Sequence, residues 1–441
     1  MLALASALVT GSTLVSSSAP ASLTYEDLAS VPQLGGPELS PDGKQFALVR
    51  DGQIVLAPAD GGWPATLTTT AGGKSDLAWS PDGTTIAFVS GGSVWTVSAG
   101  GGSPTRLTDG RGGGGDPRSA ADRQPVWSPD GQWLLYESGR RGNTDLLVIS
   151  RDGLTSHVLI STDADEGAAA WSPNGARIAY VERSPAHFSG RLLLADVDQV
   201  SGRVRGAPRE RLVAPADRGG GWSIGRPAWS PDSTQLALVL QDSGWDHVYL
   251  LPVKDGPPRA ITRGEFEADS PVFSPDGTSI AVTSNEANLE ERHIWIVPTA
   301  GGKSKRLTSP TVGVESAPQW SPDGRQLYFT RSTPLEPAGL FVTAVAGGDV
   351  ARGVIRSRVL NFERAGLKPP VEVQFKSRDG LEISALLYSP ATSSSSGTKP
   401  PAILWIHGGP EGQDLLESRG DRKSTRLNSS HLAVSRMPSS A

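Results

Sequence analysis

A tetrapeptide related to Ser-Pro-Asp-Gly occurs seven times in this chain of 441 residues, and this repeat limits its possible folds more than any other feature. The copies begin at Ser40, Ser80, Ser128, Ser172, Ser230, Ser274 and Ser321. Their spacings are 40, 48, 44, 58, 44 and 47 residues, the length of one four-stranded propeller blade. The repeat therefore predicts an all-β, seven-bladed propeller, with an extended loop in the 58-residue interval.

The residues around each copy are typical of a tight turn between two strands. Ser caps the turn, Pro presets φ, and Asp followed by Gly tolerates the reversal. An aromatic residue usually precedes the motif, and a continuous apolar run follows it, as at residues 46–49, 86–89, 178–181 and 236–239. Continuous apolar runs are typical of strands buried on both faces, which is the environment of a sheet between two neighbouring blades.

A small residue recurs within these runs, at Ala47, Ala87, Ala179, Ala237 and Ala281. Small side chains would let neighbouring sheets approach closely, although a general preference for small core residues explains them nearly as well. Each unit then supplies another strand and a glycine-containing hairpin turn, such as residues 61–62 and 301–302. We interpret the repeated Trp, Gly and Asp residues as fold-determining and assign no site to them.

A different pattern begins after Pro369 and Pro370. Residues 371–376 and 381–388 flank Ser-Arg-Asp-Gly and predict a β-hairpin. An apolar strand pattern at residues 401–406 then ends at His407, Gly408, Gly409 and Pro410. In lipases and esterases, a His-Gly-Gly loop after the third strand lets glycine N–H groups point at a developing oxyanion. We therefore predict an oxyanion loop here, the alternative being a turn that merely ends the strand.

The order of these parts resembles the prolyl oligopeptidase family of serine peptidases, above all its acylaminoacyl-peptidase and dipeptidyl-peptidase branches. The likeness covers about residues 23–420, and the Leu-Thr-Tyr-Glu-Asp-Leu sequence at residues 23–28 resembles the family's lead-in to the first blade. The resemblance implies that the propeller caps the active site and admits short peptides by size. It also implies that Gly408 and Gly409 flank the oxyanion hole, while His407 shapes the loop rather than acting as a base.

The family pattern next requires a Gly-x-Ser-x-Gly elbow followed by Asp and His, but only 31 residues follow Pro410 and no elbow stands among them. Residues 221–225 match the elbow pattern inside the propeller, without a helix pattern after them, so we do not interpret Ser223 as the nucleophile. We expect an incomplete α/β-hydrolase domain without a catalytic triad, and an inactive chain.

The histidines offer no alternative centre. His157, His187, His247 and His293 are scattered over different repeats and lack metal-ligand spacing. His431 lies in a tail, residues 421–441, whose first half resembles the translation of a sequencing adapter and which we exclude from fold reasoning. We expect neither a metal nor another cofactor.

Charge and composition exclude several classes of function. The formal net charge is −5, without long blocks of one sign, which gives no basic stripe for nucleic acid and no polybasic patch for a membrane. No apolar run reaches the ~18 residues that a membrane span needs. The chain has no cysteine, which excludes disulfides, thiolate nucleophiles and cysteine-bound zinc. Short peptides are the partners we expect for the parent protein, and the oligomeric state stays open.

We divide the chain into residues 1–21, 22–365 (the propeller), 366–420 (the start of the hydrolase domain) and 421–441 (the extraneous tail). Residues 1–21 contain an apolar run and an Ala-Pro-Ala cleavage pattern, but no Lys or Arg precedes them, so a signal peptide is one of two open alternatives. A periplasmic or secreted location is favoured over a cytoplasmic one. The competing hypothesis for function is a non-enzymatic, TolB-like propeller that acts as a protein interaction module.

Overall fold

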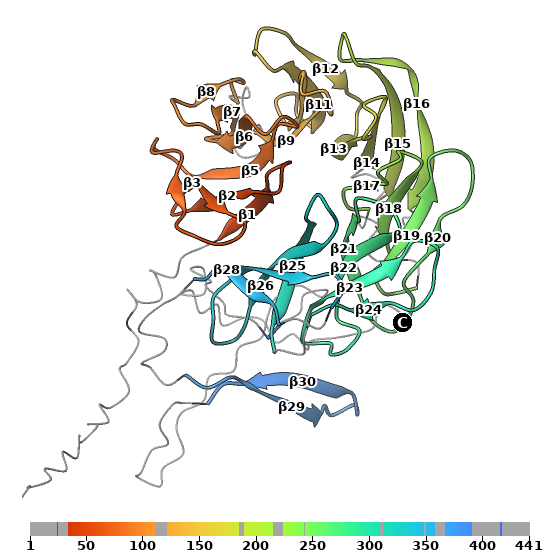
Figure 1. Ribbon diagram of the computed structural model, residues 1–441. Coiled ribbons are helices and arrows are strands. Elements are labelled where there is room, and N and C mark those ends of the chain that lie inside the picture. The colour runs from red at the N-terminus through yellow and green to blue at the C-terminus, as the bar shows by residue number, and fades with distance from the viewer. Residues whose placement is uncertain are drawn as a thin grey trace, which may run out of the picture.

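The computed structural model describes residue 24 and residues 34–110, 121–184, 189–214, 224–241, 243–308, 312–347, 350–357, 367–389 and 415–416. Within these residues the strands form seven four-stranded sheets and one two-stranded hairpin. The seven sheets follow one another around a ring (Figure 1). The predicted seven-bladed propeller is therefore confirmed.

Each blade is built from one contiguous stretch of sequence. Blade I contains β1 (Gly35–Leu39), β2 (Gln45–Arg50), β3 (Gln53–Pro58) and β4 (Ala65–Thr66). Blade II contains β5 (Lys74–Trp79), β6 (Thr85–Ser90), β7 (Ser93–Ser98) and β8 (Thr105–Arg106). Blade III contains β9 (Asp122–Trp127), β10 (Trp133–Ser138), β11 (Asp145–Ser150) and β12 (Ser156–Ile160). Blade IV contains β13 (Asp165–Trp171), β14 (Arg177–Ser184), β15 (Ser189–Asp198) and β16 (Arg203–Ala214).

The remaining three blades repeat this plan. Blade V contains β17 (Ala228–Trp229), β18 (Gln235–Leu240), β19 (His247–Pro252) and β20 (Arg259–Ala260). Blade VI contains β21 (Ala268–Phe273), β22 (Ser279–Ser284), β23 (His293–Pro298) and β24 (Lys305–Arg306). Blade VII contains β25 (Val314–Trp320), β26 (Gln326–Ser332), β27 (Gly339–Ala344) and β28 (Arg352–Ile355). In every blade the strands pair in sequence order, and the first strand lies innermost, beside the first strand of the next blade.

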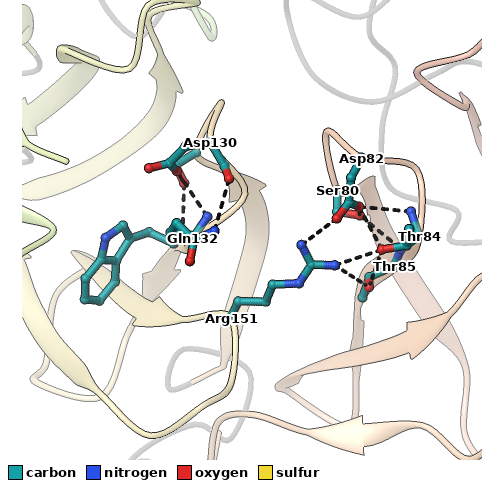
Figure 2. Close-up of polar contacts among 9 residues, drawn as sticks. Ser80, Asp82, Thr84, Thr85, Asp130, Gln132 and Arg151 are labelled. Carbon is teal, nitrogen blue, oxygen red and sulfur yellow. Dashed lines mark hydrogen bonds and ion pairs between the residues drawn. The ribbon is translucent and has the colours of Figure 1, made fainter. Parts of the chain in front are cut away.

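The repeated tetrapeptide joins the first two strands of each blade. In blade II the Ser80 hydroxyl donates a hydrogen bond of 2.6 Å to Asp82 Oδ1 and accepts one of 3.0 Å from the N–H of Thr85 (Figure 2). Gly83 has a φ of 68°, which glycine adopts at little steric cost. The same Ser-to-Asp bond recurs in the other blades, with Asn174 replacing Asp in blade IV. The local sequence therefore specifies each turn.

The turn that begins at Ser80 in blade II also contacts the neighbouring blade III. Arg151, in the turn between β11 and β12 of blade III, donates a hydrogen bond of 2.7 Å to Asp82 Oδ2 and further bonds to the hydroxyls of Thr84 and Thr85 (Figure 2). This bond from Arg151 is the largest of several that hold the pKa of Asp82 below its usual range.

The hydrophobic core is divided among the interfaces between blades. The recurring alanines Ala47, Ala87, Ala179, Ala237 and Ala281 are fully buried, and each packs against the apolar side chains of the following blade. Larger side chains take this role in blades III and VII, where Leu135 and Tyr328 reach the next blade. Close packing of small residues is therefore the commoner way in which these sheets meet.

Tryptophan side chains tie most inner strands to the preceding blade. Each indole Nε1–H donates to a backbone carbonyl one blade earlier, over 2.9–3.1 Å, in the pairs Trp79–Glu38, Trp127–Ala78, Trp229–Ala170 and Trp320–Val272. Trp171 of blade IV is buried, yet its Nε1 has no partner among the described residues. Phe273 of blade VI has no N–H to donate.

Among the described strands, none is exchanged between blades I and VII where the ring closes. Gln319 of β25 accepts a hydrogen bond of 2.9 Å from the N–H of Leu39, and its amide donates to the carbonyl of Pro37. Phe46 and Tyr328 pack edge to face, with ring centroids 5.0 Å apart. Closure therefore rests on side-chain contacts and buried apolar surface.

The structure of the 58-residue interval between Ser172 and Ser230 differs in part from what the sequence predicts. We expected an extended loop there, but strands β15 and β16 lengthen to 10 and 12 residues. Cross-strand charge pairs accompany the extension, including Arg191–Glu210 at 3.1 Å and Arg205–Asp198. These pairs are diagonal neighbours in the register of the two strands, and opposite charges at such positions support an antiparallel ladder.

Beyond the ring, strands β29 (Val371–Lys376) and β30 (Glu382–Leu387) form the predicted hairpin, with Lys376 opposite Glu382 beside the turn. Figure 1 places this hairpin apart from the blades. The described residues after it are few, and they show no α/β-hydrolase domain.

Candidate functional site

The predicted oxyanion loop, His407, Gly408, Gly409 and Pro410, lies outside the described residues. The chain is described on either side of it, in the β29–β30 hairpin and at Leu416. The N–H of Leu416 donates a hydrogen bond of 2.9 Å to the carbonyl of Glu290, and the Leu416 side chain is 6% exposed. Glu290 lies in the connection between the second and third strands of blade VI. Leu416, beyond the predicted loop, therefore contacts the end of the ring at which the second strand of each blade connects to the third.

The candidate site that the structure does describe lies at the same end of the ring, in the mouth of the central channel. A cavity of about 1080 Å³ is lined by the starts of the inner strands β1 and β5, by the turn after β2, and by residues of blades III and V. Its polar side chains are those of Glu38, Asp51, Lys74, Ser75, Asp76, Gln124 and Arg226.

A bulge repeated in six inner strands creates this lining. The bulged residue stands three positions before the end of its strand and has a φ between 38° and 52°, in Gly36, Asp76, Gln124, Ala168, Ser270 and Ala317. Except for glycine, residues rarely adopt this conformation. Arg226 stands at the equivalent place in blade V, three residues before Trp229. One offset in the repeat thus places Asp76, Gln124 and Arg226 around the channel.

Arg226 reaches across the channel mouth. Its Nη2 donates a hydrogen bond of 2.6 Å to Oε1 of Gln124, and so links blade V to blade III past Ala168 of blade IV. The backbone N–H of Gln124 in turn donates to Asp76 Oδ2 over 3.3 Å. Glu38 is held by its backbone, since its carbonyl accepts the Trp79 indole at 2.9 Å.

The electrostatics of the mouth centre on Glu38 and Arg226. The Glu38 side chain contacts channel solvent, but the protein that surrounds it raises its pKa from 4.5 to about 7, an effect that Arg226 partly offsets. Burial lowers the pKa of Arg226, while Glu137, Glu38 and Asp76 act in the opposite direction. The charges of Glu38, Asp76 and Arg226 therefore interact with one another across the mouth.

The described histidines do not form a catalytic or metal centre. His247 and His293 are buried, and His293 lies between the carboxylates of Glu291 and Glu315, at 2.7 and 3.3 Å. Among the described residues, no three His, Cys, Asp or Glu side chains are placed to hold a metal ion. His187, Ser223 and His431 lie outside the described residues.

The part of the chain that the structure describes has no helix with the length and apolar character needed to cross a membrane.

The channel residues were not predicted from the sequence, because each is unexceptional within its own repeat. The seven repeats reveal these residues when they are aligned on the residue before each turn, which is aromatic in every blade except blade I. The third position before that residue is Asp76, Gln124 and Arg226 in blades II, III and V, where other blades have Gly, Ala or Ser.

The sequence pattern of the TolB beta propeller domain matches residues 25–205 and 223–361. The uncharacterized peptidase YuxL of Bacillus subtilis is 33% identical over 116 residues, which are 25% of this chain and 17% of that protein. The Tol-Pal system protein TolB of Bordetella pertussis is 30% identical over 173 residues, which are 39% of this chain and 36% of that protein. The chain thus spans well under half of either curated relative.

Two peptidases represent the similar solved structures. The puromycin-hydrolyzing peptidase of Mycobacterium tuberculosis aligns with a TM-score of 0.73 and 19% identity, over 90% of this chain and 65% of that one. The acylaminoacyl peptidase of Pyrococcus horikoshii aligns with a TM-score of 0.64 and 16% identity, over 88% of this chain and 62% of that one. At these identities the likeness shows a shared fold.

Proposed function

The chain belongs to the TolB beta propeller domain family, and from that premise we propose that its propeller serves a serine peptidase that hydrolyses short peptides, of the acylaminoacyl or dipeptidyl type. One observation carries the proposal. The likeness to the mycobacterial peptidase covers 90% of this chain, more than the blades from Gly35 to Ile355 occupy. A propeller that acted alone would give no reason for the likeness to extend beyond its blades.

In the proposed mechanism, residues 366–420 begin the α/β-hydrolase domain. The backbone N–H groups of Gly408 and Gly409 would stabilise the oxyanion of the tetrahedral intermediates through which an acyl-enzyme forms and is hydrolysed, and His407 would shape their loop. The ring would limit access to peptides that fit its channel. Because the Gly-x-Ser-x-Gly match in the 441 residues, at residues 221–225, lies inside the propeller pattern and lacks a helix pattern after it, we expect these residues to form no acyl-enzyme by themselves.

A non-enzymatic interaction module is the second candidate, and the 30% identity to a TolB protein over 173 residues favours it. The segment at residues 407–410 distinguishes the two candidates, because a propeller that only binds a partner has no use for an oxyanion loop.

The deciding experiment sequences the source locus across the codon of Gly420. We expect the frame to continue to a Gly-x-Ser-x-Gly elbow with a later Asp and His. The protein from that frame should react with a fluorophosphonate probe and lose the reaction when the elbow Ser is replaced by Ala. A frame without an elbow would leave the interaction module as the better account. Labelling of the 441-residue chain that disappears in Ser223→Ala would overturn our assignment of the nucleophile.

A further inference from the structure

Two buried histidines stand at equivalent places in blades V and VI and have different partners. His247 opens β19 and His293 opens β23, the third strands of their blades, and they are 2% and 0% exposed. His247 Nδ1 lies 3.2 Å from the hydroxyl of Thr262, and its Nε2 lies 3.0 Å from the carbonyl of Gly264. A neutral imidazole satisfies both partners, because its N–H donates to the carbonyl while the hydroxyl donates to its other nitrogen.

Both ring nitrogens of His293 face carboxylates instead. Nε2 is 2.7 Å from Glu291 Oε2, and Nδ1 is 3.3 Å from Glu315 Oε2. Blade V has Trp245 and Ala268 at the places of these two glutamates. An ionised carboxylate accepts hydrogen bonds and has none to donate, and a neutral imidazole has a single N–H. The geometry therefore calls for a hydrogen on each nitrogen of His293, and so for a positive charge on the ring.

The contacts of Glu315 are those of an ionised carboxylate. Its Oε2 also accepts hydrogen bonds from the hydroxyl of Thr308 and, over 3.3 Å, from the N–H of Ile294. Burial lowers the pKa of Arg306 and of Arg331, and the charge of Glu315 is the largest effect in the opposite direction. Glu315 is therefore an acceptor at this position and not a donor.

Glu291 belongs to the connection between β22 and β23, which is the connection that Leu416 contacts. The carbonyl of the preceding residue, Glu290, accepts the hydrogen bond of 2.9 Å from the N–H of Leu416. The Glu291 side chain is 13% exposed, and His293 holds its carboxylate. The hydrogen on His293 Nε2 therefore helps to fix the backbone on which Leu416 rests.

We propose that His293 is a pH-sensitive switch: its charged ring fixes Glu291, and loss of one ring proton at higher pH loosens the connection and weakens its contact with Leu416. Arg292 does not replace the lost proton, because it is already paired with Glu267. The charge of the ring is independent of the proposed function. Only the assignment of Leu416 to a hydrolase domain rests on that function.

The first measurement is nitrogen NMR of labelled histidine rings in the full 441-residue chain, which distinguishes charged from neutral imidazole. We expect His293 to keep both ring hydrogens to a higher pH than His247. Glu291→Gln should lower the pH at which His293 loses its second hydrogen, because a neutral amide has less need of a charged donor. Glu286→Gln removes the same charge from an exposed place in the same connection. It is the matched control and should leave that pH unchanged.

The second measurement is hydrogen exchange of the Leu416 amide, divided by the intrinsic exchange rate at each pH. We expect this ratio to rise about tenfold as His293 loses its second hydrogen, because one hydrogen bond to a charged group no longer opposes local opening. In Glu291→Gln the rise should occur at lower pH, and in Glu286→Gln it should stay where it is in the natural chain.

Several outcomes would overturn the proposal. If His293 and His247 lost their second hydrogens at the same pH, the ring would not be held charged by its carboxylates. A Leu416 ratio that stayed constant through the titration of His293 would break the link to this contact. The NMR signal of His293 is the one missing from His293→Gln, and the signal that moves in Glu291→Gln identifies it if the first variant fails to fold. Neither measurement uses turnover, so the result is independent of whether the locus encodes a peptidase.

Discussion

The indole hydrogen bonds between blades allow a test in which one bond is the main difference between two variants. Trp127 and Trp171 stand at equivalent places in blades III and IV and are 6% and 8% exposed. Trp127 donates a hydrogen bond of 3.1 Å to the carbonyl of Ala78, whereas Trp171 Nε1 has no partner among the described residues. Replacement of either by Phe removes a similar amount of buried ring.

The two variants should therefore differ in stability. Trp127→Phe loses a hydrogen bond worth about 1 kcal/mol, while Trp171→Phe removes an N–H whose burial without a partner itself costs about 1–3 kcal/mol. We expect Trp127→Phe to lower the free energy of unfolding by about 2 kcal/mol more than Trp171→Phe. Arg151 lies 5.6 Å above the centre of the Trp127 ring, and the phenyl ring of the variant would still offer it a face on which to stack.

Urea unfolding of the full chain, followed by far-ultraviolet circular dichroism, measures this difference without using tryptophan fluorescence, which the substitutions change directly. A Trp171→Phe midpoint as low as that of Trp127→Phe, or lower, would refute the assignment of the bond. It would mean that ring volume, and not the indole N–H, holds these blades together.

Three further predictions follow from side chains that the structure places. Burial raises the pKa of Glu166 from 4.5 to about 7, so the folded state holds the extra proton, and the free energy of unfolding should fall as pH rises from 4.5 to 7; Glu166→Gln should make the dependence of the urea midpoint on pH less steep, and the part due to Glu38 should remain. Arg151→Met should lower stability by less than about 1 kcal/mol, because its ion pair with Asp82 is solvent-exposed; a larger thermal shift would contradict that. Limited proteolysis should cut beyond Pro370 before it cuts the blades, since β29 exposes Val371 and Phe375; mass spectrometry that showed earlier cuts within the blades would disagree.

The blades could be predicted from the sequence because their determinants are local. Each Ser-Pro-Asp-Gly turn is closed by hydrogen bonds within six residues, as between Ser80 and Thr85. The alanines that face the next blade recur in continuous apolar runs, and such runs predict strands that are buried on both faces. Blade IV was predicted less well, because its extra residues lengthen a charged strand ladder, and ladder pairing depends on partners distant in sequence.

The channel site could not be predicted from local pattern. Glu38, Asp76 and Arg226 belong to three different repeats, and only closure of the ring brings them to one cavity. Ring closure was equally hidden, because the Gln319 contacts span about 280 residues of sequence. The predicted oxyanion loop stays a prediction, since residues 407–410 lie outside the described part of the chain.

The absence of strand exchange between the described strands of blades I and VII has a consequence for how the protein is made. Each blade can complete its hydrogen-bonded ladder as soon as its own 40 to 58 residues have left the ribosome, without waiting for a distant strand. Assembly can thus proceed blade by blade from the N-terminus, because the described strands of each blade pair only with one another. Docking of Tyr328 and Gln319 onto blade I is then the last event in building the ring, and blade I must keep its docking face uncovered until blade VII arrives.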